Sequence, residues 1–138
     1  MENSLDTWIF KDRITLIGDA AHAHGGAYAT GGSLAIDDAY AFSLAISSVF
    51  NQADTNRPSV ERIQTALRLY ERTRKPHADK LLGIVHNTNK NKAVNTGGPI
   101  SDESLTRRAA ERPDTVWLHE HDVVDAFNNT VQELKLNS

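Results

Sequence analysis

Cysteine is absent from this chain of 138 residues. A disulfide framework, a thiolate nucleophile and a cysteine-ligated metal are therefore excluded. Positive charge is also scarce, because 15 Lys and Arg stand against 18 Asp and Glu and leave a formal net charge of −3. This balance gives no electrostatic footprint for binding nucleic acid or an anionic membrane surface.

Long apolar stretches are missing as well. No run approaches the roughly 18 apolar residues of a membrane-spanning helix, and the first residues are polar and acidic rather than an apolar signal region. Hydrophobic residues make up 39% of the chain, which can supply the core of about one domain. We therefore expect a soluble, cytoplasmic protein.

The most informative segment is residues 13–32. Residues 13–17 predict a short buried strand that ends at Gly18. Residues 19–32 hold four glycines in fourteen positions, and a helix is expected to begin near Ser33. A strand, a glycine-rich loop and a helix in this order can hold a phosphate-bearing cofactor at the helix N-terminus.

Two features of this segment carry its chemistry. Asp19 directly follows the expected strand, where side chains of open sheets meet ligands, and its carboxylate suits a ribose or ribityl hydroxyl that donates a hydrogen bond. Gly31 and Gly32 come just before the expected helix, so their backbone N–H groups can approach an electron-rich edge. From the residue types alone, a structural turn with a capping aspartate is the alternative.

Helices are predicted for most of the remaining chain. The first has an apolar face at helical spacing, formed by Ala35, Ala39, Phe42, Ile46 and Val49. Pro58 suits the first turn of a second helix, whose buried stripe consists of Val60, Ile63, Leu67 and Tyr70. Pro76 should kink or break that helix, and the basic run at 72–80 is expected to form a solvated helix face.

The C-terminal part is more polar. Residues 87–99 are rich in Asn, Lys and Gly and predict a flexible loop. A short charged helix is expected at 102–111, followed by a docking helix after a turn that carries Trp117 as a core anchor. One strand with about four helices is unusual for a cofactor-binding fold, in which strands and helices normally alternate.

The glycine-rich segment resembles a known motif. The run GDAAH at 18–22, the glycine pair at 31–32 and the run DDA at 37–39 resemble the second flavin-binding motif of FAD-dependent aromatic monooxygenases, of the p-hydroxybenzoate and salicylate hydroxylase type. In that family the aspartate contacts the ribityl and pyrophosphate region of FAD, and the glycine turn places backbone amides near the isoalloxazine. The resemblance thus implies that FAD is the cofactor and that Asp19, Gly31 and Gly32 bind it.

The resemblance extends over nearly the whole chain. The run YERTRKPH at 70–77 is similar to the family's Tyr-Glu-x-x-Arg segment, and the runs at 24–40 and 117–122 resemble a fungal salicylate-hydroxylase-like subgroup. Two positions depart from the common pattern, because Gly26 and Thr30 replace a loop proline and a Gln-Gly pair found in many members.

A larger departure concerns what such proteins contain upstream. Members of the family begin with a strand, a G-x-G-x-x-G turn and a helix that holds the ADP half of FAD, and this sequence has no such fingerprint. The resemblance therefore implies a truncated or partial chain. It would be the C-terminal part of an α/β FAD-binding monooxygenase fold that lacks the N-terminal dinucleotide-binding half. The chain by itself is expected to be mainly α with a short β segment. We expect it to bind FAD weakly and to expose apolar helical faces, which a partner chain could cover.

Four parts are expected along the chain. They are a strand with the flavin-binding loop (1–32), long helices of the FAD-binding region (33–90), a flexible loop with a short helix (91–113) and a C-terminal docking helix (114–138).

The function implied by the resemblance is hydroxylation of an aromatic or polyketide-type small molecule with FAD, NAD(P)H and O2, in aromatic or secondary metabolism. No residue of this chain is expected to be catalytic. A second class of function stays open, namely a catalytically inactive remnant that binds a partner through exposed helical faces or has no function.

Histidines suggest one further kind of site. His22 with His24, or His119 with His121, could present nitrogen ligands to a metal ion. No HExxH motif or cysteine accompanies these pairs, so no metal site is expected, and His22 is predicted to be a packing or hydrogen-bonding residue. Ser33 lies in a GGSLA run that lacks the last glycine of a nucleophile elbow, which argues against a hydrolase.

Overall fold

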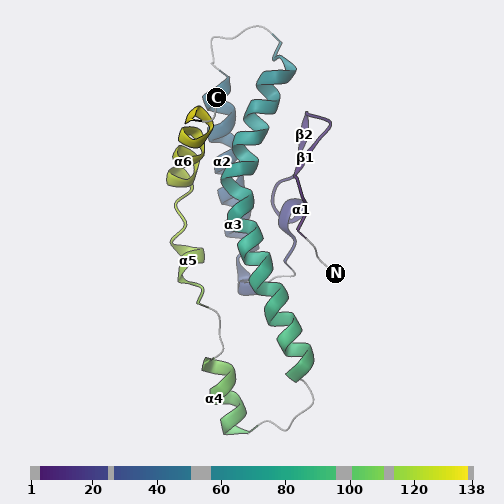
Figure 1. Cartoon of the computed structure of the whole chain (residues 1–138), viewed down its shortest axis with the longest axis vertical. Helices are drawn as coiled ribbons and strands as arrows, with labels where there is room; N and C mark the ends of the chain where they lie inside the picture. The colour runs from purple at the N-terminus through teal and green to yellow at the C-terminus, as the bar shows by residue number, and fades with distance from the viewer. Residues whose placement is uncertain (1–3, 25–26, 51–56, 96–100, 111–113, 137–138) are drawn as a thin grey trace.

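The computed structural model describes residues 4–24, 27–50, 57–95, 101–110 and 114–136, and these are mainly helical (Figure 1). The elements are, in chain order, the strands β1 (Ile9–Phe10) and β2 (Ile14–Thr15), the helix α1 (Asp19–His22), the 3₁₀ turn η1 (Ala27–Ala29), and the helices α2 (Gly31–Val49), α3 (Val60–Asn95), α4 (Asp102–Ala110), α5 (Val116–His119) and α6 (Val123–Leu136). The expectation of a mainly α chain with a short β segment is confirmed. No helix in these ranges is long and apolar enough to cross a membrane.

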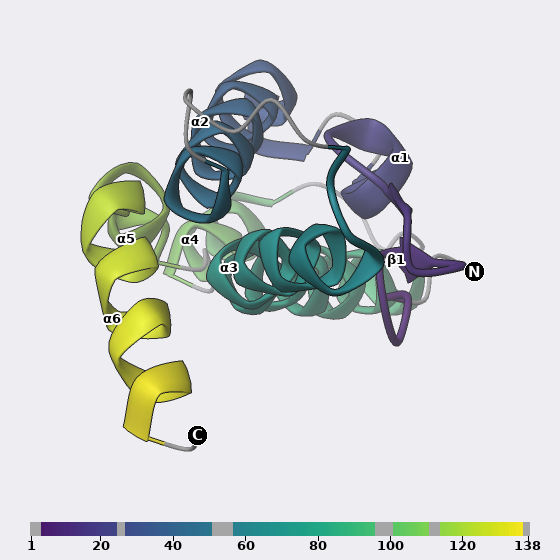
Figure 2. The same cartoon turned by 90° about the horizontal axis from the view of Figure 1, so that it is seen from above.

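Helices α2, α3 and α6 pack against one another around the main core. Figure 1 shows α3 as the long central helix, with α6 on one side and the β1–β2 hairpin and α1 on the other, and Figure 2 gives the view from above. Ala41 and Ala45 of α2 are fully buried, and their small side chains let α2 approach α3 closely. Trp8, Tyr70 and Phe127 fill the core around them.

The predicted buried strand is wrong in both length and burial. Its counterpart β2 covers two residues and pairs antiparallel with β1, so that Phe10 lies opposite Ile14. Ile14 is 53% exposed and Ile17 is 38% exposed. A two-stranded hairpin has no second layer to bury both of its faces, which explains why these apolar side chains meet solvent.

Helix α2 begins at Gly31, two residues before the predicted start at Ser33. Its fully buried face consists of Leu34, Asp38, Ala41 and Ala45, whereas Ala39 of the predicted face is exposed. The predicted face is offset by about one residue from the observed one, because Asp38 holds a central buried position that a count of apolar residues leaves out.

Helix α3 continues through Pro76, so of the predicted kink or break the break is wrong. A proline inside a helix costs about 3 kcal/mol. Buried residues on both sides of Pro76, including Tyr70, Leu81 and Leu82, pack the helix against its neighbours and offset that cost. The flexible loop predicted for 87–99 is also wrong for residues 87–95, because they belong to α3. Residues 96–99 lie outside the described residues.

The prediction of a solvated basic face at 72–80 fails at Thr73, Arg74, His77 and Ala78, which are buried. Arg74 is 0% exposed, whereas its neighbour Arg72 is exposed as expected. The predicted buried stripe is confirmed at Leu67 and Tyr70.

The C-terminal predictions are largely confirmed. Helix α4 matches the short charged helix, with Glu111 outside the described residues, and α6 docks on the core through Val123 and Phe127. Trp117 is only partly buried, and Leu118 is the buried residue of α5. Trp117 packs against the buried cluster of Leu34, Leu81, Val85 and Leu118, as expected of a core anchor, and its indole also lies beneath the ammonium of Lys80, 4.0 Å from the ring centroid.

Candidate functional site

The segment between β2 and α2 brings the predicted cofactor-binding residues together. Gly18 has a φ of 60° and a ψ of −140°, a conformation that favours glycine, and it reverses the chain into α1. The carbonyl of Gly18 accepts hydrogen bonds from the N–H groups of Ala21 and His22, at 2.8 and 3.1 Å. Asp19 is therefore the first residue of a one-turn helix, and it is exposed to solvent.

The N-terminus of α2 presents free backbone donors. Thr30 precedes the helix, and its side chain does not cap it. Among the described residues, the N–H groups of Gly31 and Gly32 have no acceptor, and the first backbone bond of this end runs from Leu34 to the carbonyl of Thr30. These N–H groups and the helix dipole together favour an electron-rich ligand.

Asp19 and the start of α2 are close in space. A Cβ placed on Gly31 would lie 3.7 Å from Oδ1 of Asp19 and 3.4 Å from Cε1 of His24, whereas a Cβ on Gly32 would meet nothing within 4 Å. No hydrogen bond or ion pair engages the Asp19 carboxylate within the described part of the chain. An exposed, unpaired acceptor thus lies beside unpaired donors, which fits a ligand that carries both hydroxyl groups and acceptor atoms.

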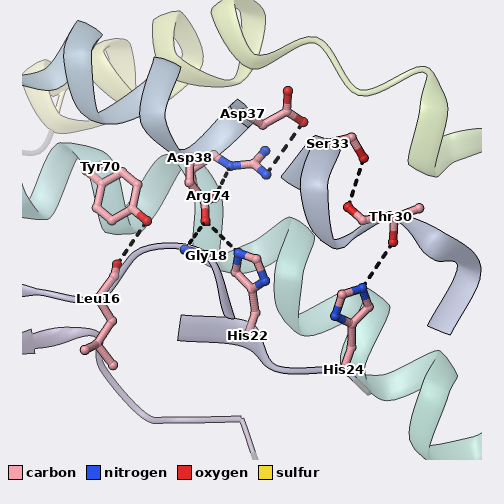
Figure 3. A network of polar contacts seen from close by, with 10 residues as sticks. All are labelled: Leu16, Gly18, His22, His24, Thr30, Ser33, Asp37, Asp38, Tyr70 and Arg74. Carbon is pink, nitrogen blue, oxygen red and sulfur yellow. Dashed lines mark hydrogen bonds and ion pairs between the residues drawn. The ribbon is translucent and has the colours of Figure 1, made fainter. Parts of the chain in front are cut away.

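A buried ionic network lies directly beneath this surface (Figure 3). Oδ2 of Asp38 accepts hydrogen bonds from the Gly18 N–H at 2.9 Å and from Nε2–H of His22 at 2.6 Å. Oδ1 of Asp38 accepts a bond from Nε of Arg74 at 2.9 Å, and Nη2 of Arg74 lies 3.7 Å from Oδ2 of Asp37. We call Gly18, His22, Asp38 and Arg74 the Asp38 network.

The Asp38 network is charged at neutral pH. Burial by itself would raise the pKa of Asp38, but the hydrogen bonds from His22, Arg74 and Gly18 outweigh burial and hold this pKa below its usual value. Asp38 and Arg74 are both 0% exposed, so each charge depends on the other for compensation. The prediction that His22 is a hydrogen-bonding residue is confirmed, since it is 2% exposed and bound to Asp38.

The segment at 70–77 holds the same loop from the α3 side. The hydroxyl of Tyr70 donates to the carbonyl of Leu16 at 3.1 Å, and burial raises the pKa of Tyr70. Oε1 of Glu71 accepts hydrogen bonds from the Thr7 hydroxyl, at 2.6 Å, and from the Trp8 N–H. The strands before the loop are therefore fixed to the helix that also carries Arg74.

Sequence reasoning missed Asp38 and Arg74 as members of the site. One observable pattern pointed to Asp38, because it stands four residues after Leu34 and three before Ala41, where a core residue is expected. Arg74 stands in a run of other basic residues, and the one signal that marked it was its place as the arginine of the Tyr-Glu-x-x-Arg segment. In the described ranges no group of three or more His, Asp or Glu side chains could hold a metal ion.

Comparisons with known proteins identify the family of the chain. The sequence profile of the family described as FAD binding domain matches residues 1–84. A segment of 79 residues is 37% identical to a protein named Kynurenine 3-monooxygenase from Salinispora tropica, and covers 57% of this chain and 15% of that protein. A segment of 73 residues is 29% identical to a protein named FAD-dependent monooxygenase from Gibberella moniliformis, and covers 53% of this chain and 17% of that protein.

The chain thus matches well under two thirds of the length of these relatives, and no solved structure matches it. Because the family profile covers more than half of the sequence, the chain belongs to the FAD binding domain family, whose cofactor is FAD.

Proposed function

We propose that the chain forms one wall of the FAD site of an FAD-dependent monooxygenase. The observation that carries this proposal is the Asp19 carboxylate beside the unpaired N–H groups of Gly31 and Gly32 at the start of α2. The two relatives described above, both named as monooxygenases, support the same class of reaction.

The residues of this wall suit different parts of the cofactor. The carboxylate of Asp19 accepts a hydrogen bond from a ribityl hydroxyl, whereas the N–H groups of Gly31 and Gly32 donate to electron-rich atoms under the influence of the α2 dipole. Bound FAD would supply hydride uptake from NAD(P)H and the reaction with O2 that hydroxylates an aromatic or polyketide-type molecule. We assign no catalytic residue to this chain, because its described polar groups hold and orient the cofactor.

The finer features of the proposal follow the family resemblance. We place the reaction in aromatic or secondary metabolism, in the cytoplasm, in a protein of the salicylate-hydroxylase-like type. The dinucleotide-binding half of the fold would come from polypeptide that this sequence does not contain, and it or a partner chain would cover exposed apolar residues such as Ile36 and Tyr40. The alternative of an inactive helical module is not favoured by the named relatives.

The direct test is an FAD titration of the full chain, followed residue by residue through backbone amide NMR shifts, which detect weak binding. We expect the shifts of Asp19, Gly31 and Gly32 to respond. Asp19→Asn should weaken binding about tenfold, because the hydrogen bond then goes to a neutral amide oxygen instead of a charged carboxylate. Asp6→Asn is the matched control, since Asp6 is also exposed but lies outside the loop. Equal affinity of these two variants, or shifts confined to other residues, would contradict the proposal.

A further inference from the structure

Both ends of α1 are held by a single carboxylate oxygen. Gly18, which caps α1, and His22, its last residue, each donate a hydrogen bond to Oδ2 of Asp38 (Figure 3). A helix of four residues is too short to be stable by itself in water. The position of α1 therefore depends on these two bonds.

This arrangement connects α1 to the start of α2. Asp38 lies seven residues after Gly31, which is about two helical turns, so the two positions share one face of α2. Asp19 directly follows Gly18, and its Oδ1 lies 3.7 Å from the position that a Cβ on Gly31 would occupy. One side chain of α2 thus sets the distance between the Asp19 carboxylate and the amides at the N-terminus of that helix.

Asp38 does this without access to a ligand. Its side chain is 0% exposed, and the Nε of Arg74 occupies the other carboxylate oxygen at 2.9 Å. The planar guanidinium comes from α3 and donates to Oδ1, whereas the two donors at the ends of α1 bind Oδ2, so it helps to fix the orientation of the carboxylate. With one oxygen turned to Arg74, the other is directed at Gly18 and His22.

We infer that Asp38 is a positioning residue of the flavin site, which holds Gly18 and His22 and thereby places the Asp19 carboxylate beside the Gly31 and Gly32 amides. This inference rests on the proposed function for the ligand, but the placement itself concerns only residues of this chain. Asp38 acts through Asp19 and does not touch the cofactor.

The test uses two matched pairs of variants of the full chain. His22→Leu removes the donor from one end of α1, whereas His22→Gln keeps an N–H group at about the reach of the imidazole Nε2. Asp38→Asn removes the charge, and Asp37→Asn makes the same change at the next residue, whose side chain is 35% exposed. Because Asp38→Asn leaves buried Arg74 with only the more distant carboxylate of Asp37 and can prevent folding, the His22 pair decides the outcome if that variant does not fold.

Two measurements are made on each folded variant. The first is amide hydrogen exchange at positions 18, 21 and 22, which should be about tenfold faster in His22→Leu and Asp38→Asn, and near wild type in His22→Gln and Asp37→Asn. The second measurement introduces Asp19→Asn into each protein and records the resulting change in the amide shift of Gly31. This change should be present in wild type and His22→Gln and absent in His22→Leu. The FAD affinity should fall about tenfold in His22→Leu and recover in His22→Gln.

If the amides at 18, 21 and 22 exchange at the wild-type rate in a folded His22→Leu variant, the inference is wrong. It is also wrong if they exchange faster but Asp19→Asn still changes the amide shift of Gly31. If FAD binds the wild-type chain but binds His22→Leu equally well, the positioning role is also wrong. If the wild-type chain binds no FAD, the proposed function fails, and the exchange and Gly31 shift measurements still decide the placement of Asp19 by Asp38.

Discussion

The Nε of Arg74 lies 2.9 Å from Oδ1 of Asp38, and neither side chain is exposed to solvent. The two residues come from different helices and are 36 positions apart in the sequence. Their pairing joins α2 to α3 at the level of the glycine-rich loop. A buried ion pair of this kind makes each partner costly to remove, because the remaining charge stays buried without compensation.

The first prediction concerns the stability of this pair. Arg74→Met should lower the free energy of unfolding by about 3–5 kcal/mol, since it leaves the Asp38 carboxylate buried without its cation. Urea denaturation followed by circular dichroism measures this change. Arg72→Met is the matched control on the exposed face of the same helix, and it should change stability by less than about 0.5 kcal/mol. Equal stabilities of the two variants would show that Asp38 does not depend on Arg74.

Much of the fold could be predicted from local patterns. The spacing of Leu67 and Tyr70 identified the buried stripe of α3, and the charged run before Pro113 identified α4. The adjacency of Asp19 and the glycine pair also followed from sequence order, since a strand, a loop and a helix return the chain to the same edge.

The errors have a common physical cause, which is contact between distant residues. Periodicity treats charged residues as solvent-facing, so it could not show that Asp38 and Arg74 bury each other. The rule that proline ends a helix is local, and at Pro76 it is overridden by packing of α3 against α2 and α6. The strand at 13–17 was expected to be buried because apolar runs usually lie within a sheet. Ile14 instead belongs to a two-stranded hairpin and is exposed.

A second prediction separates ligand binding from folding at Gly32. Gly32→Ala should keep or slightly raise stability, by up to about 1 kcal/mol, because alanine favours helices and the new methyl meets no neighbour within 4 Å. The same methyl would occupy the space beside the free N–H groups, so FAD affinity should fall about tenfold.

Gly83→Ala in α3 is the matched control for Gly32→Ala. Gly83 is exposed within a helix and also has open space around its Cβ position, but it lies far along the chain from the loop. Thermal unfolding compares the stabilities, and amide shifts during an FAD titration compare the affinities. The assignment of Gly32 to the flavin site is wrong if both variants bind FAD as the wild type does.

The last prediction concerns the pH dependence of stability at the contact between α3 and the segment joining α5 and α6. The rings of His77 and His121 are stacked there, with centroids 3.9 Å apart, and Nε2 of each ring is buried without a hydrogen-bond partner in the described structure. Burial, together with the charges of His121, Arg74 and Lys80, lowers the pKa of His77 to about 3. Burial and the charge of Arg74 also lower the pKa of His121.

The sign of the effect follows from these directions. In the unfolded chain both histidines take up a proton near pH 6.5, whereas in the folded chain the pKa of His77 is about 3 and the pKa of His121 is lowered. Stability is therefore complete above about pH 6.5 and falls as the pH is lowered toward 3, by at most about 1.4 kcal/mol per pH unit for each proton. Urea denaturation between pH 7 and 5 measures this slope while carboxylates such as Asp38 stay ionised.

His77→Phe tests the assignment, because phenylalanine keeps a flat ring against His121 but does not titrate. The unfolding free energy of the variant should depend less steeply on pH between 7 and 5, because only His121 then has a pKa that is lower in the folded than in the unfolded chain. His119→Phe is the matched control, because His119 is exposed. If His77→Phe has the wild-type slope, the acid sensitivity arises elsewhere and the stacked pair is no more than a packing contact.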